Sequence, residues 1–188
     1  TWADDRDGSG FLRRTRAAGV VGVYYLLVLA VGIERLIELV VARSNARWAF
    51  ANGGVEFGHK HYPVMVSIHS ALLVSCVAEV WLLHRPFIPW LGWPMFAVAM
   101  LSQVLRWWCV RTLGRRWNTQ VIVLPESPLV HGGPYRWIHH PNYVAVVCEG
   151  LALPLIHTAW LTALWFGLAN AAVLRERIRV ENVALGYR

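Results

Sequence analysis

Two polar clusters in the second half of the chain contain the residues whose types and spacing could do chemistry. The first is His139-His140-Pro141-Asn142-Tyr143, which stands at the start of a long apolar run. A proline at the first position of a helix is a common helix start, and the unpaired backbone N–H groups there can bind a carboxylate or a phosphate. The sequence therefore predicts an anion-binding helix start with the imidazole of His140 beside it.

The second cluster follows the apolar run and reads Arg175-Glu176-Arg177-Ile178-Arg179-Val180-Glu181-Asn182. Arg177 and Glu181 are four residues apart, so they share one face of a helix. If the apolar run folds back on itself, this face returns to the side of His140. The combination suits an amino-acid moiety, with its carboxylate at the helix start and its ammonium at Glu181. Arg177 is then left for a second anion.

The composition indicates that membrane helices position these clusters. The chain has 188 residues, of which 56% are hydrophobic and 15% are charged, whereas a soluble domain carries about 25% charged residues. Such a composition excludes a disordered chain, a coiled coil and a disulfide scaffold, and the length predicts one domain. The net charge of +7 at this hydropathy favours membrane lipids as partners and disfavours nucleic acid.

Four apolar stretches are long enough to cross a bilayer, which takes about 20 residues. They are residues 19–42, 63–83, 86–110 and 143–174. The last would be about 48 Å long as one helix, and Pro154 near its middle predicts a break into a hairpin of two short helices. We therefore expect an all-α integral membrane protein with about five transmembrane helices, the last two forming a hairpin. Four spans are the alternative.

The distribution of arginine and lysine predicts the orientation of the chain. With five crossings, most of these residues gather on one side, in residues 43–60, 111–142 and 175–188. Because such residues favour the cytoplasmic side, the long 111–142 loop and the C-terminus are expected to face the cytoplasm. We expect a single membrane domain over 1–188, with N-terminal helices in 1–110 and the functional half in 111–188.

The stretch from Gln120 to Glu181 resembles the isoprenylcysteine carboxyl methyltransferase family, whose integral membrane enzymes are similar to the phospholipid N-methyltransferases. The family signature is Arg-His-Pro-x-Tyr followed, across a helical hairpin, by a pair of glutamates. Here it reads His139-His140-Pro141-Asn142-Tyr143 and Glu181-Asn182, and Gly132-Gly133-Pro134-Tyr135 resembles the family's Gly-x-Tyr turn. His139 replaces the usual arginine and Asn182 replaces the second glutamate, so two charges of the signature are missing.

The resemblance implies S-adenosyl-L-methionine as the methyl donor and a lipophilic or lipid-modified acceptor, with methylation at a carboxylate oxygen. The cofactor contacts that it implies by position are Gln120, Ser127, Pro128, Leu129, Val130, Tyr135, His140, Pro141, Asn142, Tyr143 and Glu181. The substrate-side arginine of the family falls on Arg177. A carboxylate acceptor needs no general base, but another acceptor would, and His139 and Glu149 are the candidates.

Ionisable residues inside the apolar stretches are costly and count as candidate sites. Glu34, Arg35 and Glu38 stand at helical spacing, and we expect them to neutralise one another. Glu79 and Arg106 are expected to pair between helices. These groups are interpreted as a structural network.

Three other functions remain open at this point. The first is N-methylation of an aminophospholipid by the same scaffold. The second is a reductase of the sterol-reductase type with a nicotinamide cofactor, and the third is a non-enzymatic membrane module. No metal site is predicted, because His59 and His61, which flank Lys60, lack further convergent ligands. The acceptor and the oligomeric state are left open.

Overall fold

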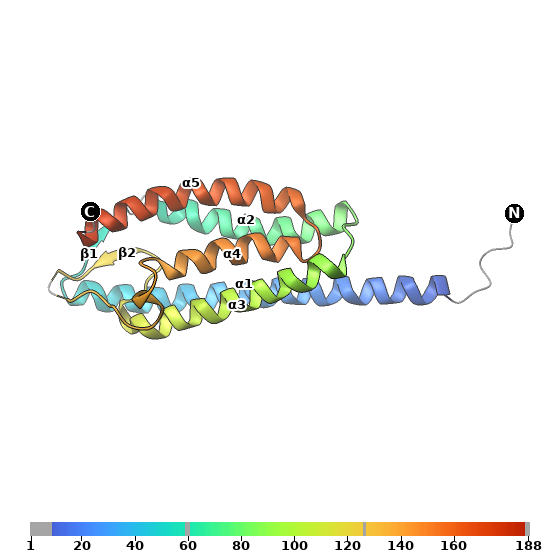
Figure 1. Ribbon diagram of the computed structural model, residues 1–188. Coiled ribbons are helices and arrows are strands. Elements are labelled where there is room, and N and C mark those ends of the chain that lie inside the picture. Colours follow the sequence, from blue (N-terminus) through green and yellow to red (C-terminus); the bar gives the residue numbers. More distant parts are fainter. Residues whose placement is uncertain (1–8, 59–60, 126, 187–188) are drawn as a thin grey trace, which may run out of the picture.

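The computed structural model describes residues 9–58, 61–125 and 127–186, and it places the side chains of all of these except 9–18 and 61. The described chain forms long helices that run side by side along one axis (Figure 1). They are α1 (Ser9–Ala51), α2 (His61–Leu82), α3 (Pro89–Leu113), α4 (Pro141–Leu155) and α5 (Trp160–Leu185). Strands β1 and β2, the C-terminal end of α5 and the 114–140 loop gather at one end of this bundle.

The first two helices carry the strongest membrane signal. By length and apolar composition, two helical segments of the described chain could cross a membrane, Gly19–Ala51 and Tyr62–Leu82. Helix α1 has 43 residues, so it is about 64 Å long and starts earlier than the apolar stretch predicted. Large apolar side chains such as Leu26 and Leu36 are 65% and 64% exposed on it. An apolar surface of this kind suits contact with lipid better than contact with water.

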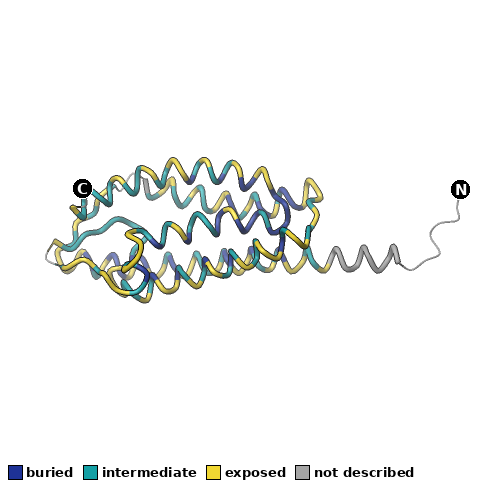
Figure 2. Tube along the Cα trace, viewed as in Figure 1, coloured by how far each residue is buried: buried dark blue, intermediate teal, exposed yellow. Residues whose placement is uncertain are grey.

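Helix α4 is a short helix inside the bundle. Its 15 residues span about 22 Å, less than the roughly 30 Å of a bilayer core. It lies among the other helices, and much of it is buried (Figures 1 and 2). Gly150 allows the closest approach of α5, because a Cβ at this position would lie 2.0 Å from Cε1 of the fully buried Phe166. The predicted hairpin is therefore present, and its first arm packs inside the bundle. Only this arm is short, because α5 has 26 residues.

The reversal between the two arms comes slightly later than predicted. Helix α4 continues through Pro154 to its last residue, and the chain turns in residues 156–159. The carbonyl of Pro154 accepts the N–H of Ala159 at 3.0 Å. Thr158 has a φ of 54°, and its hydroxyl donates to the carbonyl of Pro86 at 2.9 Å. A proline in the last turn does not break a helix, so the turn itself stops α4.

Glu79 of α2 holds the start of α5. Its carboxylate accepts the backbone N–H groups of Leu161 at 3.2 Å and Thr162 at 2.7 Å, and also the Thr162 hydroxyl at 2.7 Å. A carboxylate in this position satisfies free N–H groups and suits the positive end of the helix dipole. Arg85 donates to the same carboxylate from Nε at 2.9 Å. The predicted pair of Glu79 with Arg106 is therefore wrong, because Glu79 faces the start of α5.

The predicted network of Glu34, Arg35 and Glu38 is confirmed and is larger than expected. Arg35 donates to Glu38 at 2.7 Å and to Glu34 at 3.1 Å, all on α1. On the facing helices, Nη2 of Arg106 in α3 donates to Glu149 in α4 at 2.5 Å. Arg35 also lies 3.6 Å from Glu149. The network therefore ties α1, α3 and α4 together inside the bundle.

A two-stranded sheet is the element that the all-α prediction missed. Strand β1 (Val55–Phe57) pairs antiparallel with β2 (Val121–Val123), with Val55 opposite Val123. The loop between α3 and α4 also contains two short 3₁₀ helices, Gly114–Arg116 and Gly133–Arg136. Each strand has only three residues, too few for a recognisable alternating pattern. The sheet fixes the loop against the chain that links α1 to α2.

Gly150→Ala tests the close approach of α4 and α5. We expect it to lower the midpoint of thermal unfolding in detergent by several degrees, because the new methyl group overlaps the buried ring of Phe166 and overpacking costs about 1–3 kcal/mol. Gly22→Ala is the control, since no other group lies within 4 Å of a Cβ there. Equal midpoints for the two variants would contradict the packing described here.

Candidate functional site

Two adjoining cavities lie at the end of the bundle that holds the sheet. The polar cavity has a volume of about 100 Å³, and the loop cavity beside it has about 480 Å³. Among the predicted residues, those that line the polar cavity are Gln120, Tyr135, His139, His140, Asn142, Tyr143, Arg177 and Glu181. Those that line the loop cavity are Ser127, Pro128, Leu129, Val130, Tyr135, His139 and Glu181. The structure thus brings together nearly all the side chains that the sequence singled out.

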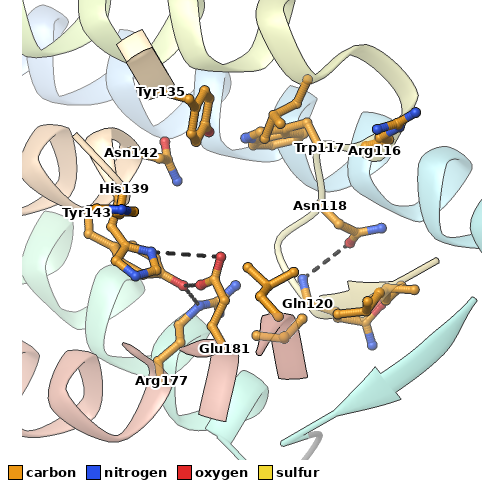
Figure 3. A pocket seen from close by; sticks show the side chains of 16 residues that line it. Arg116, Trp117, Asn118, Gln120, Tyr135, His139, Asn142, Tyr143, Arg177 and Glu181 are labelled. Atoms are coloured by element: carbon orange, nitrogen blue, oxygen red, sulfur yellow. Dashed lines mark hydrogen bonds and ion pairs between the residues drawn. The ribbon is translucent and has the colours of Figure 1, made fainter. Parts of the chain in front are cut away.

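The centre of the site is the Tyr143 hydroxyl, which joins the start of α4 to the end of α5 (Figure 3). The hydroxyl donates to the carboxylate of Glu181 and accepts a hydrogen bond from Nε of Arg177 at 2.9 Å. The guanidinium of Arg177 also lies over the Tyr143 ring, 5.7 Å from its centroid. The hairpin therefore carries Arg177 and Glu181 to the first turn of α4, as the sequence predicted.

His140 is held from two sides. Its ring stacks on that of Tyr143, with centroids 5.2 Å apart and an interplanar angle of 18°. Its Nε2 lies 2.9 Å from Oδ1 of Asn182. Because an amide oxygen only accepts, we assign the proton of this bond to Nε2. Nδ1 is then directed toward Glu181, whose Oε1 lies 3.8 Å away. Asn182, where the signature has a second glutamate, is thus the residue that orients His140.

Arg177 stands at the border of a third cavity. This apolar cavity has a volume of about 420 Å³ and shares Asn142, Tyr143 and Arg177 with the polar cavity. Nη2 of Arg177 donates to the carbonyl of Thr119 at 2.5 Å, and Nη1 lies 3.0 Å from the sulfur of Met65. The guanidinium therefore has a fixed position between a polar and an apolar space.

The start of α4 offers an anion fewer free backbone N–H groups than predicted. The N–H groups of Tyr143 and Val144 both turn back to the carbonyl of His140, at 3.1 and 3.4 Å. Pro141 has no N–H, so Asn142 supplies the one free N–H of this turn in the described structure. The Asn142 side chain also has a buried Oδ1 without a hydrogen-bond partner among the described residues. Pro141 itself is buried and does not line the polar cavity.

The two candidate bases lie in different places. His139 lines both the polar and the loop cavity. Glu149 lines neither of them, and its carboxylate is committed to Arg106 inside the bundle. Glu149 therefore lies outside both of these cavities, and its role as a base stays a prediction.

Tyr135 lines one side of the site, and its position depends on Gly133, two residues earlier in the chain. Gly133 has a φ of 55°, and a Cβ there would lie 2.3 Å from Oγ1 of Thr112. Burial raises the pKa of Tyr135 above its usual value, and the neighbouring Cys109 raises it further. The phenol therefore stays neutral across the physiological pH range and can only act there as a hydrogen-bonding group.

Glu56, Asn118 and Arg116 position predicted site residues, but they carried no recognisable sequence signal of their own. The side chain of Gln120 donates to Glu56 of β1 at 2.9 Å, and its N–H donates to Oδ1 of Asn118 at 3.1 Å. Arg116 donates to the carbonyl of Pro128 at 2.7 Å, which ties the 127–130 strip to the end of α3. These contacts join segments far apart in the chain, so no local pattern could have identified them.

Asn45 of α1 is the buried anchor of the loop that leads to Gln120. Its amide donates to the carbonyl of Trp117 at 2.8 Å and to that of Gly114 at 3.4 Å. Trp117 is itself only 3% exposed and borders the polar cavity. Asn45 therefore fixes the wall of the cavity to α1.

Among the described residues, no group of three or more His, Cys, Asp or Glu side chains converges. His59 and Lys60 lie outside the described residues, and so does the side chain of His61. The candidate site brings together the carboxylate of Glu181, the guanidinium of Arg177, the imidazole of His140 and the phenol of Tyr143.

Comparison with known proteins places these residues in a wider group. The model of the isoprenylcysteine carboxyl methyltransferase family matches residues 95–187. The uncharacterized protein YpbQ of Bacillus subtilis is 39% identical over 164 residues, which cover 87% of this chain and 96% of that protein. An uncharacterized protein of Haemophilus influenzae is 23% identical over 172 residues, covering 89% of this chain and 95% of its own length.

Asn45→Ala tests the anchoring of the cavity wall. We expect amide hydrogen exchange in residues 114–120 to become about fivefold faster, because two carbonyls lose their buried donor and one such bond contributes about 1 kcal/mol. The control is Asn52→Ala, whose exposed side chain lies just beyond the end of α1 and bonds to the carbonyl of Trp48. If exchange, measured by mass spectrometry, rises equally in both variants, Asn45 has no special role.

Proposed function

Because the chain belongs to the isoprenylcysteine carboxyl methyltransferase family, and is thus a membrane methyltransferase, we propose that it uses S-adenosyl-L-methionine to methylate a carboxylate of a lipophilic acceptor. The observation that carries this proposal is the position of Arg177. It contacts Tyr143 and, through Tyr143, Glu181 on the polar side, and it borders the apolar cavity on the other. A polar donor and an apolar acceptor can therefore meet at one residue.

The polar and loop cavities fit the methyl donor in size and chemistry. Glu181 accepts a hydrogen bond from Tyr143, borders both cavities, and its side chain is 26% exposed. It is therefore open to a ligand ammonium, while the free N–H of Asn142 would take the carboxylate of the same ligand. The 127–130 strip would hold the nucleoside part, since the loop cavity of about 480 Å³ is within the usual range for small ligands.

The proposed reaction requires the protein mainly to align the methyl donor with the acceptor and to exclude water. When bound, S-adenosylmethionine supplies a methyl group whose bond to sulfur breaks as the acceptor oxygen bonds to it, with the electron pair left on sulfur. Arg177 would orient the carboxylate of the acceptor by a paired hydrogen bond, and the apolar cavity would keep water from it. A carboxylate is already ionised at neutral pH, so no side chain has to remove a proton.

The bundle and its charges support a multi-pass enzyme with a cytoplasmic site. We propose that the long helices cross the bilayer and that the end with the sheet faces the cytoplasm. Arg111, Arg115, Arg116 and Arg136 all lie in or beside the 114–140 loop at this end, and α5 adds further arginines there. Such clusters favour the cytoplasmic side. The donor would then enter from water, and the acceptor would enter from the lipid.

Binding of S-adenosylhomocysteine to the protein in detergent, measured by calorimetry, tests the donor site. We expect micromolar binding, and a loss of at least tenfold in Glu181→Gln, because the charged partner of the ammonium is removed. Glu176→Gln on the same helix is the matched control, since Glu176 is exposed and pairs only with Arg179. Unchanged affinity in Glu181→Gln would refute its role. Binding of a nicotinamide dinucleotide instead would favour a reductase.

Arg177→Lys tests the acceptor side. The charge remains but the fixed fork is lost, so we expect turnover to fall by about 10–100-fold with donor affinity within about twofold of the original. Turnover is measured as transfer of labelled methyl groups to a prenylated cysteine or to hexadecanoic acid. The product should release labelled methanol in mild alkali, as a methyl ester does. An alkali-stable product from the prenylated cysteine would point to methylation of its amine, and a parallel loss of donor affinity would move Arg177 to the donor site.

A further inference from the structure

The apolar cavity contains a belt of polar side chains that the proposed reaction does not use. Most of its wall is apolar, with residues such as Leu29, Ile33, Leu73, Val146, Val173 and Leu174. Its volume of about 420 Å³ is that of a typical small-ligand site. Deeper than Arg177, however, the wall also includes Glu38, His69, Arg106 and Asn170, from four different helices.

Asn170 is the clearest of these groups. It is 5% exposed, it lines the cavity, and its amide has no hydrogen-bond partner in the described part of the chain. The amide is not one of the fully enclosed side-chain groups, so it faces the cavity, where a ligand can hydrogen-bond to it. Asn170 precedes Arg177 by seven residues on α5, which places it about 10 Å farther along the helix axis.

His69 and Glu38 face the same space with unused acceptor atoms. Nδ1 of His69 lies 2.9 Å from the carbonyl of Met65 and must donate to it, so Nε2 of the neutral ring is an acceptor. One oxygen of Glu38 accepts from Arg35, and the other lies 3.8 Å from Nε of Arg106, which is beyond hydrogen-bond distance. His69 follows Met65 by one turn of α2, about 6 Å, and Met65 touches Arg177.

We propose that the belt of Glu38, His69 and Asn170 binds a hydroxyl group of the acceptor, about 6–10 Å deeper in the bundle than the atom that is methylated. The inference rests on the proposed function, because it takes the apolar cavity to be the acceptor site. A hydroxyl both donates and accepts, so it complements the Asn170 amide together with the acceptor atoms of Glu38 and His69. A hydroxyl carries no charge, so it leaves the pairing of Glu38 and Glu149 with Arg106 undisturbed.

The belt therefore selects an acceptor with two polar groups, the carboxylate that is methylated and a hydroxyl. A simple apolar tail would fill the same volume but would leave the Asn170 amide unpaired. A site built to hydrogen-bond a hydroxyl discriminates against the analogue that lacks it, because its buried polar groups then lose their partner. The acceptor class is thus a long-chain acid that carries a hydroxyl part-way along the chain.

Equilibrium binding of three fatty acids to the protein in detergent tests the proposal without turnover. The probes are hexadecanoic acid, 8-hydroxyhexadecanoic acid and 16-hydroxyhexadecanoic acid. We expect the 8-hydroxy acid to bind about tenfold more tightly than the parent, and the 16-hydroxy acid to gain nothing, because its hydroxyl lies beyond the belt. Equal affinity of the 8-hydroxy acid and the parent, or no binding of either, would overturn the proposal.

Asn170→Leu should abolish the tenfold preference and keep the affinity for hexadecanoic acid, because leucine has a similar size and no polar group. The control is Ser102→Ala, which removes a buried hydroxyl of α3 that bonds to Val98 and lies outside the cavity. A preference that survives in Asn170→Leu would overturn the assignment. S-adenosylhomocysteine binding, measured on the same samples, reports the fold. If the original protein does not bind S-adenosylhomocysteine but prefers the 8-hydroxy acid, the proposed function is wrong, and the assignment of the belt as a hydroxyl site is supported.

Discussion

The candidate site depends on a buried carboxylate at the opposite end of the hairpin. Glu79 of α2 accepts the first N–H groups of α5 and so determines where this helix begins. A helix rises by a fixed amount and turns by a fixed angle per residue. Its start therefore also determines which residues of its last turns face α4. Arg177 and Glu181 meet Tyr143 because the turn after Pro154 and the cap at Glu79 set this register.

Charged groups have two distinct uses in this bundle. Arg35, Arg106, Glu38 and Glu149 lie inside it, where each charge has an opposite partner and the network joins three helices. Unpaired charges would be far too costly there. At the cytoplasmic end that we propose, Glu181 keeps part of its surface open, so it remains free to bind. Burial and pairing thus distinguish the charges that join the helices from Glu181, which is open to a charged ligand.

Three cavities meet around a few rigidly held side chains. Tyr143 and Arg177 lie on helices, and the loop that completes the wall is fixed by Asn45, by the pairing of β1 with β2 and by Arg116. Such rigidity matters for the proposed methyl transfer, because an activated methyl group needs alignment more than it needs acid or base chemistry. Two charges of the family signature are missing here, and alignment does not require them. Asn182 holds His140 by a neutral hydrogen bond.

The sequence by itself determined the helical membrane class, the hairpin and the two clusters that form the site. Hydropathy, the spacing of Arg177 and Glu181, and the His-Pro-x-Tyr signature are local properties, so they can be read without coordinates. Only the tertiary structure decided the partners: Glu79 with the start of α5, Glu149 with Arg106, and Asn45 with the loop at Trp117. These pairs join separate segments, and their formation depends on how whole helices are rotated and shifted against one another. No local pattern encodes that rotation, and for the same reason the three-residue strands and the unpaired Asn170 emerged only from the packed bundle.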